Sequence, residues 1–118
     1  MRRKISKKRT TDQVFETRRA AFRAAKRDHG VPMKTRPKKV VYPYSQEAIK
    51  YKLDKRNRRL YIFQIIRNLF GRLVINLFFI REDKEAIYAD GGKQTEHFNV
   101  GDPDEDPKLR NHYYFKRR

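Results

Sequence analysis

The chain has 118 residues, no cysteine, and 31 lysines and arginines against 14 aspartates and glutamates, which gives a formal net charge of +17. That length suits one domain, because two hydrophobic cores would each be too small to bury much surface, and the lack of cysteine excludes a disulfide scaffold and a thiolate metal site. Aromatic residues make up 13% of the chain, more than in disordered polymers, so the composition predicts a small packed domain with a basic surface.

The first third of the chain predicts a basic arm and one amphipathic helix. We expect residues 1–10 to form a flexible arm and residues 11–118 to form a single domain. Apolar residues recur at helical spacing from Val14 to Ala25 and predict a helix over about 12–28, capped by Thr10 or Thr11 and ended by Gly30. Three prolines then predict an extended connection over 31–44, and a weak pattern indicates one short helix over 45–53.

The second half of the chain has the composition of strands. Residues 60–66 and 73–80 are rich in β-branched and aromatic side chains, and Gly71 in the connecting segment favours a hairpin turn. Shorter strands are expected over 86–89, 97–100 and 112–115, with an acidic loop over 101–107. The fold class is therefore α+β, with an N-terminal helix packed on an antiparallel sheet.

The positive charge lies almost entirely in the first half. Residues 1–59 carry 21 basic and 5 acidic side chains, whereas residues 60–118 carry 10 and 9. Such a field attracts polyanions, so nucleic acid is the expected partner. The alternatives are a solvated face that binds only weakly, an acidic protein, or an anionic membrane surface. Residues 60–80 are the most apolar stretch, but arginines and a glycine interrupt it, so no membrane span is expected.

Two of the three histidines have the setting of catalytic groups. His97 and His112 each open a short aromatic strand, and two imidazoles brought together can act as base and acid on a phosphodiester. They are equally compatible with histidines at strand edges that bond only to backbone. His29 ends the predicted helix, where a structural role is expected.

Carboxylates follow the predicted hairpin directly. Glu82 and Asp83 come after Arg81, and a carboxylate in this place can remove a proton from a ribose hydroxyl, orient an imidazole or bind a divalent metal. A solvated turn is the alternative. Substrate binding is expected from basic residues of the helix and from two tyrosines near the C-terminus, namely Arg18, Arg19, Arg23, Lys26, Arg27, Tyr113 and Tyr114.

Several segments of the chain resemble a known family. Residues 19–33 read RAAFRAAKRDHGVPM, and later segments read IREDK (80–84), YADGG (88–92), EHFN (96–99) and HYY (112–114). These segments resemble the C-terminal nuclease domains of bacterial polymorphic toxins, a family often described as HNH/endonuclease VII-type toxins. The resemblance implies a module of a larger secreted or delivered toxin that cleaves nucleic acid in the cytoplasm of a target bacterium. It also implies inhibition by a cognate immunity protein, which we expect to be acidic.

The leading hypothesis is a metal-independent ribonuclease, a monomer by itself or a heterodimer with its immunity protein. A metal finger needs a helix after its hairpin, and only a strand-like segment follows His112, so the arrangement of barnase-like and colicin-like toxins is favoured over it by analogy. His97 or Glu82 would act as base, His112 as acid, and Arg81 would stabilise the phosphorane. One alternative is a DNase that uses Mg²⁺, with Glu82, Asp83, His97 and His112 as ligands. Another is a basic protein that binds nucleic acid without cleaving it.

Overall fold

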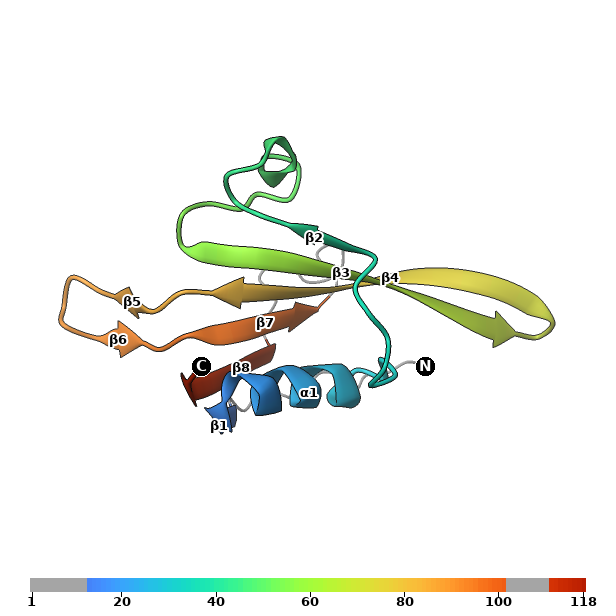
Figure 1. Ribbon diagram of the computed structural model, residues 1–118, viewed down its shortest axis with the longest axis horizontal. Helices are drawn as coiled ribbons and strands as arrows, with labels where there is room; N and C mark the ends of the chain where they lie inside the picture. Colours follow the sequence, from blue (N-terminus) through green and yellow to red (C-terminus); the bar gives the residue numbers. More distant parts are fainter. Residues whose placement is uncertain (1–12, 102–110) are drawn as a thin grey trace.

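The computed structural model describes residues 13–101 and 111–118, and it is an α+β fold with one helix packed on a mostly antiparallel sheet (Figure 1). The arm expected over residues 1–10 and most of the expected acidic loop lie outside the described residues. Six strands form the main sheet in the order β1-β8-β7-β4-β3-β2, and two short strands, β5 (Ala86–Ile87) and β6 (Lys93–Gln94), form a separate small hairpin. Within the main sheet, β1 and β8 run parallel and the other neighbours run antiparallel.

The helix begins later than the sequence predicts. Residues Gln13–Thr17 form strand β1, which pairs with β8 (Asn111–Arg117), and helix α1 spans Arg18–Asp28. Thr17 is the N-cap, since its hydroxyl oxygen accepts a hydrogen bond from the backbone N–H of Ala20 at 3.1 Å. Val14 and Phe15 fit either a strand or a first helical turn, and pairing with a strand about a hundred residues away decides between the two. The predicted start at residue 12 is therefore wrong, and the predicted end is confirmed.

The connection after the helix contains two short elements. Strand β2 (Lys39–Val41) pairs with β3, and a single 3-10 turn (Gln46–Ala48) stands where a short helix was expected. Val41, Ala48 and Leu53 of this connection are buried on the side of the sheet away from α1.

The predicted hairpin is confirmed, and it is longer than expected. Strand β3 (Asn57–Leu69) and strand β4 (Arg72–Asp83) pair along their whole length around a turn in which Phe70 and Gly71 both have positive φ. The half of this hairpin next to its turn, which we call the free part, extends well beyond the other strands (Figure 1). Strand β7 (His97–Gly101) then pairs with β4 on one edge and with β8 on the other.

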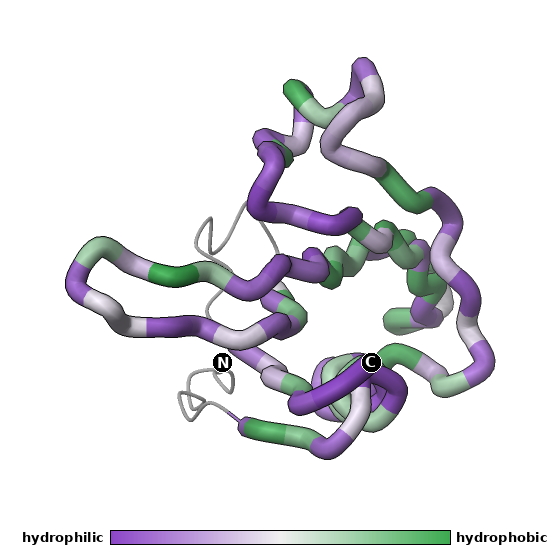
Figure 2. Tube along the Cα trace, turned by 60° about the vertical axis from the view of Figure 1, so that its left-hand side comes forward, coloured by the Kyte–Doolittle hydropathy of each residue, from purple (hydrophilic) through white to green (hydrophobic). Residues whose placement is uncertain are grey.

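The sheet has a core on each side. We call the side that contacts α1 the helix side; here the alanines of α1 pack on aromatic and aliphatic residues such as Phe63, Ile80 and Phe98. Figure 2 shows both hydrophilic and hydrophobic residues in the helix; Arg19 and Arg23 are exposed and Ala21 and Ala25 are buried, as an amphipathic helix requires. We call the other side the histidine side; its smaller core includes Leu60, Ile62 and Phe79. Among the described residues no helix is long and apolar enough to cross a membrane.

Candidate active site

The fold brings two histidines from different strands together. His97 lies on β7 and His112 on β8, and the register pairs His97 with Tyr114 and Asn99 with His112. Side chains of paired residues point to the same side of a sheet, so both imidazoles lie on the histidine side. Their ring centres are 5.3 Å apart, and the ring of Tyr114 lies 4.8 Å from that of His97. This is the juxtaposition that the sequence predicts if the two strands pair.

His97 is the buried member of the pair. Its side chain is 4% exposed, its Nδ1 donates a hydrogen bond to the backbone carbonyl of Thr95 at 2.8 Å, and its Nε2 lies 3.6 Å from a carboxylate oxygen of Asp83. Burial lowers the pKa of His97, so the imidazole is neutral at pH 7. Because the carbonyl fixes the proton on Nδ1, Nε2 is the atom that can accept a further proton, and it does so beside a negative charge.

Asp83 is held in place by three side chains. Arg81 donates from both Nε and Nη2 at 3.0 Å, Asn57 donates at 2.6 Å, and Asn99 donates to the oxygen that faces His97. These contacts fix the carboxylate relative to the imidazole. Sequence reasoning left open whether Glu82 or Asp83 orients an imidazole, named Asp83 itself as a metal ligand, and missed both asparagines, although Asn99 lies two residues from His97 and so on the same side of the strand.

His112 is the more exposed of the two histidines, and a row of polar side chains leads to it. The Tyr114 hydroxyl lies 3.4 Å from His112 Nδ1 and accepts a hydrogen bond from Gln94 at 2.9 Å. The Tyr88 hydroxyl donates to the same Gln94 side chain at 2.7 Å. Side chains of the small β5–β6 hairpin therefore reach the more exposed imidazole through the Tyr114 hydroxyl.

Glu82 does not join this site. It precedes Asp83 on β4 and so points to the helix side, where its side chain is fully buried. Arg18 donates to both carboxylate oxygens at 2.9 Å, and Arg118 donates at 3.0 Å. Burial alone would raise the pKa of Glu82, but the hydrogen bonds and charges of these arginines outweigh it and hold the pKa below its usual value. A role for Glu82 as the base beside His112 is not supported by this placement.

The ligand set expected for a metal-dependent enzyme is divided by the sheet. Asp83, His97 and His112 lie on the histidine side and Glu82 on the helix side. Within residues 13–101 and 111–118, no three histidine, aspartate or glutamate side chains are arranged to hold a metal ion.

The seven residues expected to bind substrate do not form one surface. Arg19, Arg23 and Arg27 are exposed along one stripe of α1, whereas Lys26 turns inward and donates to the carbonyl oxygens of Met33 and Thr35 at 2.8 and 2.9 Å. Tyr113 is buried on the helix side. Its hydroxyl donates to a carboxylate oxygen of Asp28, just before the helix C-cap His29. Arg18 is bound to Glu82, and Tyr114 alone of the seven is part of the histidine site.

Searches with family models, curated proteins and solved structures find no match to this chain. The fold and the site thus define an α+β protein with a strongly basic surface and a cross-strand pair of histidines backed by an aspartate.

Proposed function

We propose that the chain is a nuclease that cleaves phosphodiester bonds, with RNA as the favoured substrate and with His97, His112 and Asp83 as its active site. The observation that carries the proposal is the pair of imidazoles 5.3 Å apart on adjacent strands. The net charge of +17 supports it, because polyanions are drawn to such a protein.

The protonation state of His97 suits cleavage by transfer of the phosphoryl group to a ribose hydroxyl. The 2′-oxygen attacks phosphorus, its proton passes to a base, and the bond from phosphorus to the 5′-oxygen breaks as an acid protonates that oxygen. His97 is neutral at pH 7 and can accept the proton at Nε2, where Asp83 stabilises the imidazolium that forms. His112, the more exposed imidazole, protonates the leaving oxygen.

Arg81 is the candidate for stabilising the charged phosphorane. Its Nε and Nη2 are bound to Asp83, and its side chain is 27% exposed. Among the described residues its Nη1 makes no hydrogen bond, so this nitrogen can donate to a phosphate oxygen.

The test is incubation of the purified chain with total RNA and with plasmid DNA, each in Mg²⁺ and in excess EDTA. RNA cleavage that survives EDTA is the expected result. DNA cleavage abolished by EDTA would replace this mechanism with a metal-dependent one, and failure to cut either substrate would leave a protein that only binds nucleic acid.

The toxin role rests on the resemblance to polymorphic toxin nucleases and is tested in cells. We propose that the domain acts in the cytoplasm of a target bacterium and is blocked by an acidic immunity protein. Expression should then arrest growth, and His112→Ala should relieve the arrest at equal protein level. Continued growth with the wild-type chain would contradict this role.

A further inference from the structure

The helix side of the sheet carries a second polar cluster, which the nuclease mechanism does not use. We call it the arginine cluster, and it consists of Arg18, Arg58, Arg59 and Arg118 around Glu82 and Glu96. Arg118 donates to both carboxylates, at 3.0 Å to Glu82 and 3.1 Å to Glu96, and so joins the two halves. Arg58 donates to Glu96 from Nε at 3.1 Å and again from Nη2.

The cluster holds more positive charge than its own structure needs. Among the described residues two carboxylates face four guanidinium groups, and Arg18 alone already occupies both oxygens of Glu82. Arg59 lies with its Nε 3.3 Å from the same carboxylate, and that buried nitrogen makes no hydrogen bond to any described residue. Like charges held this close repel one another, so a surplus of fixed guanidinium groups is typical of a site for an anion.

The positive groups face outward and the negative groups face inward. The four arginine side chains are between 24% and 41% exposed, whereas Glu82 is fully buried and Glu96 is 19% exposed. A ligand therefore meets guanidinium groups already oriented by buried carboxylates. Binding to such a surface costs little side-chain entropy, because the arginines are ordered before the ligand arrives.

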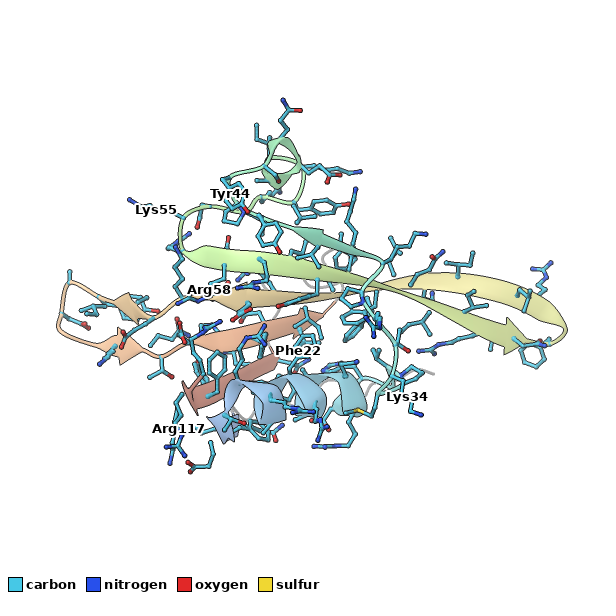
Figure 3. The ribbon with its side chains drawn as sticks, viewed as in Figure 1. Phe22, Lys34, Tyr44, Lys55, Arg58 and Arg117 are labelled. Carbon is cyan, nitrogen blue, oxygen red and sulfur yellow. The ribbon has the colours of Figure 1, made fainter. Side chains whose placement is uncertain are left out.

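Exposed aromatic rings adjoin the cluster. Tyr42 and Tyr44 stack on each other with ring centres 5.4 Å apart, and the guanidinium carbon of Arg59 lies 5.9 Å from the Tyr42 ring centre. Tyr44 is 84% exposed, so one face of its ring is open to solvent. Tyr44 and Arg58 lie towards the same end of the sheet, the end away from the free part of the β3–β4 hairpin (Figure 3).

We propose that the arginine cluster binds the phosphodiester backbone of a single-stranded nucleic acid, one of whose bases stacks on Tyr44. Guanidinium groups match phosphate geometry, and an exposed ring beside them is the usual platform for an unpaired base. This inference rests on the proposed function for the identity of the ligand. It adds a surface on the helix side to a mechanism located on the histidine side.

The two sites lie back to back at one end of the sheet. Glu82 of the cluster is followed directly by Asp83 of the histidine site, and Glu96 is followed directly by His97. The two sites therefore occupy opposite sides of the same end of β4 and β7.

Fluorescence anisotropy with a short labelled 2′-O-methyl oligoribonucleotide tests the inference, because this probe lacks the attacking hydroxyl. The Arg59→Gln/Arg118→Gln double variant should bind about tenfold more weakly or worse at low salt. Its slope of log affinity against log salt should be shallower by about 1.4, or about 0.7 for each phosphate that an arginine no longer neutralises. Tyr44→Ala should weaken single-strand binding about tenfold and leave duplex binding unchanged.

The matched control is Arg67→Gln/Arg72→Gln, which removes the same charge from exposed positions on the free part of the hairpin. Equal losses in the two double variants would overturn the inference, because the general field of the protein would then explain them. An unchanged affinity and salt slope in Arg59→Gln/Arg118→Gln would overturn the inference as well. This holds even if the variant loses binding to an acidic protein, because the cluster would then be a protein-binding surface. Circular dichroism shows whether the double variant folds, and Tyr44→Ala keeps the test open if it does not.

The two proposals fail separately. If the wild-type chain cleaves RNA while the cluster variants bind and cleave normally, the inference falls and the nuclease stands. If no substrate is cleaved but binding depends on Arg59, Arg118 and Tyr44, the surface stands and the nuclease falls.

Discussion

Glu82 and Asp83 are neighbours in the chain, and they serve two different parts of the molecule. Consecutive residues of a strand point to opposite sides, so Glu82 enters the arginine cluster and Asp83 faces His97. Glu82 is the buried charge on which the contacts of α1, β3 and the C-terminal residue converge.

Glu82→Gln should destabilise the fold strongly. The change removes the charge that compensates three guanidinium groups, and breaking a buried ion pair costs about 3–5 kcal/mol. Urea denaturation measures this loss. Glu85→Gln is the control, because Glu85 forms an exposed pair with Lys93 whose removal should cost less than about 1 kcal/mol. Equal free energies of unfolding for the two variants would show that the buried ion pairs of Glu82 do not stabilise the fold more than an exposed pair does.

His97 should make stability depend on pH. Burial lowers its pKa in the folded state, so the unfolded chain takes up a proton first, near the ordinary histidine value of about 6.5. The stability that neutral His97 provides is fully present above that value. It is lost as the pH falls from there towards the pKa of the folded state.

His97→Gln should therefore flatten the fall in unfolding free energy between about pH 7 and pH 5. His29 also has a pKa lowered by burial, so part of the slope should remain, and His29→Gln shows how large that part is. Denaturant titrations across this range make the comparison. A slope in His97→Gln equal to that of the wild type would contradict the assigned burial.

At the scale of elements, the start of the helix is set by Thr17. Thr17→Ala should cost about 1 kcal/mol, because the backbone N–H of Ala20 loses the hydroxyl that caps it. Thr95→Ala is the control, since that side chain is exposed and lies outside any helix. Thermal unfolding of both variants measures the difference, and equal midpoints would be inconsistent with a cap at Thr17.

The β3–β4 hairpin has a packed half and an exposed free part. The same isoleucine-to-threonine change made in each compares how much the two parts contribute to stability. Ile75 is 58% exposed on the free part, whereas Ile80 on the same strand is fully buried in the helix-side core. Ile75→Thr should change stability by less than about 0.5 kcal/mol. Ile80→Thr should cost about 2 kcal/mol or more, because it leaves a cavity and buries a hydroxyl. Similar costs measured in urea would mean that the free part is packed.

The elements of this fold differ in how much of them can be predicted. The hairpin is visible in the sequence because β-branched residues flank Gly71, and the turn requires the positive φ that glycine adopts readily. The start of α1 is not visible, because β1 exists through its pairing with β8. Local pattern determines the first feature, and a contact between distant segments determines the second.

The candidate site is predictable in part for a related reason. The pairing of β7 and β8 could be anticipated, and it places His97 beside His112. The choice between Glu82 and Asp83 could not be made, because a shift of one residue in register exchanges the two sides of a strand. The register is interrupted between Asn57 and Arg59, and the sequence carries no sign of this irregularity.

At the scale of the whole molecule, two groups of arginines, mostly from the described first half of the chain, lie on and beside the helix side. Arg19, Arg23 and Arg27 line the outer face of α1, and the arginine cluster lies beside its first turn. The histidine site lies on the other side of the sheet, among the carboxylate and amide groups of Asp83 and Asn99. The two proposals thus place the contacts of the arginine cluster with a polyanion and the chemistry on it on opposite sides of one sheet.

Cleavage of RNA by histidine variants in excess EDTA tests this assignment most directly. His97→Ala and His112→Ala should each lower the initial rate by about 100-fold or more, because each removes one partner of a proton transfer. His29→Gln, at the end of the helix and outside the site, should stay within a few-fold of the wild type. Wild-type rates in both His97→Ala and His112→Ala would contradict the active site proposed here.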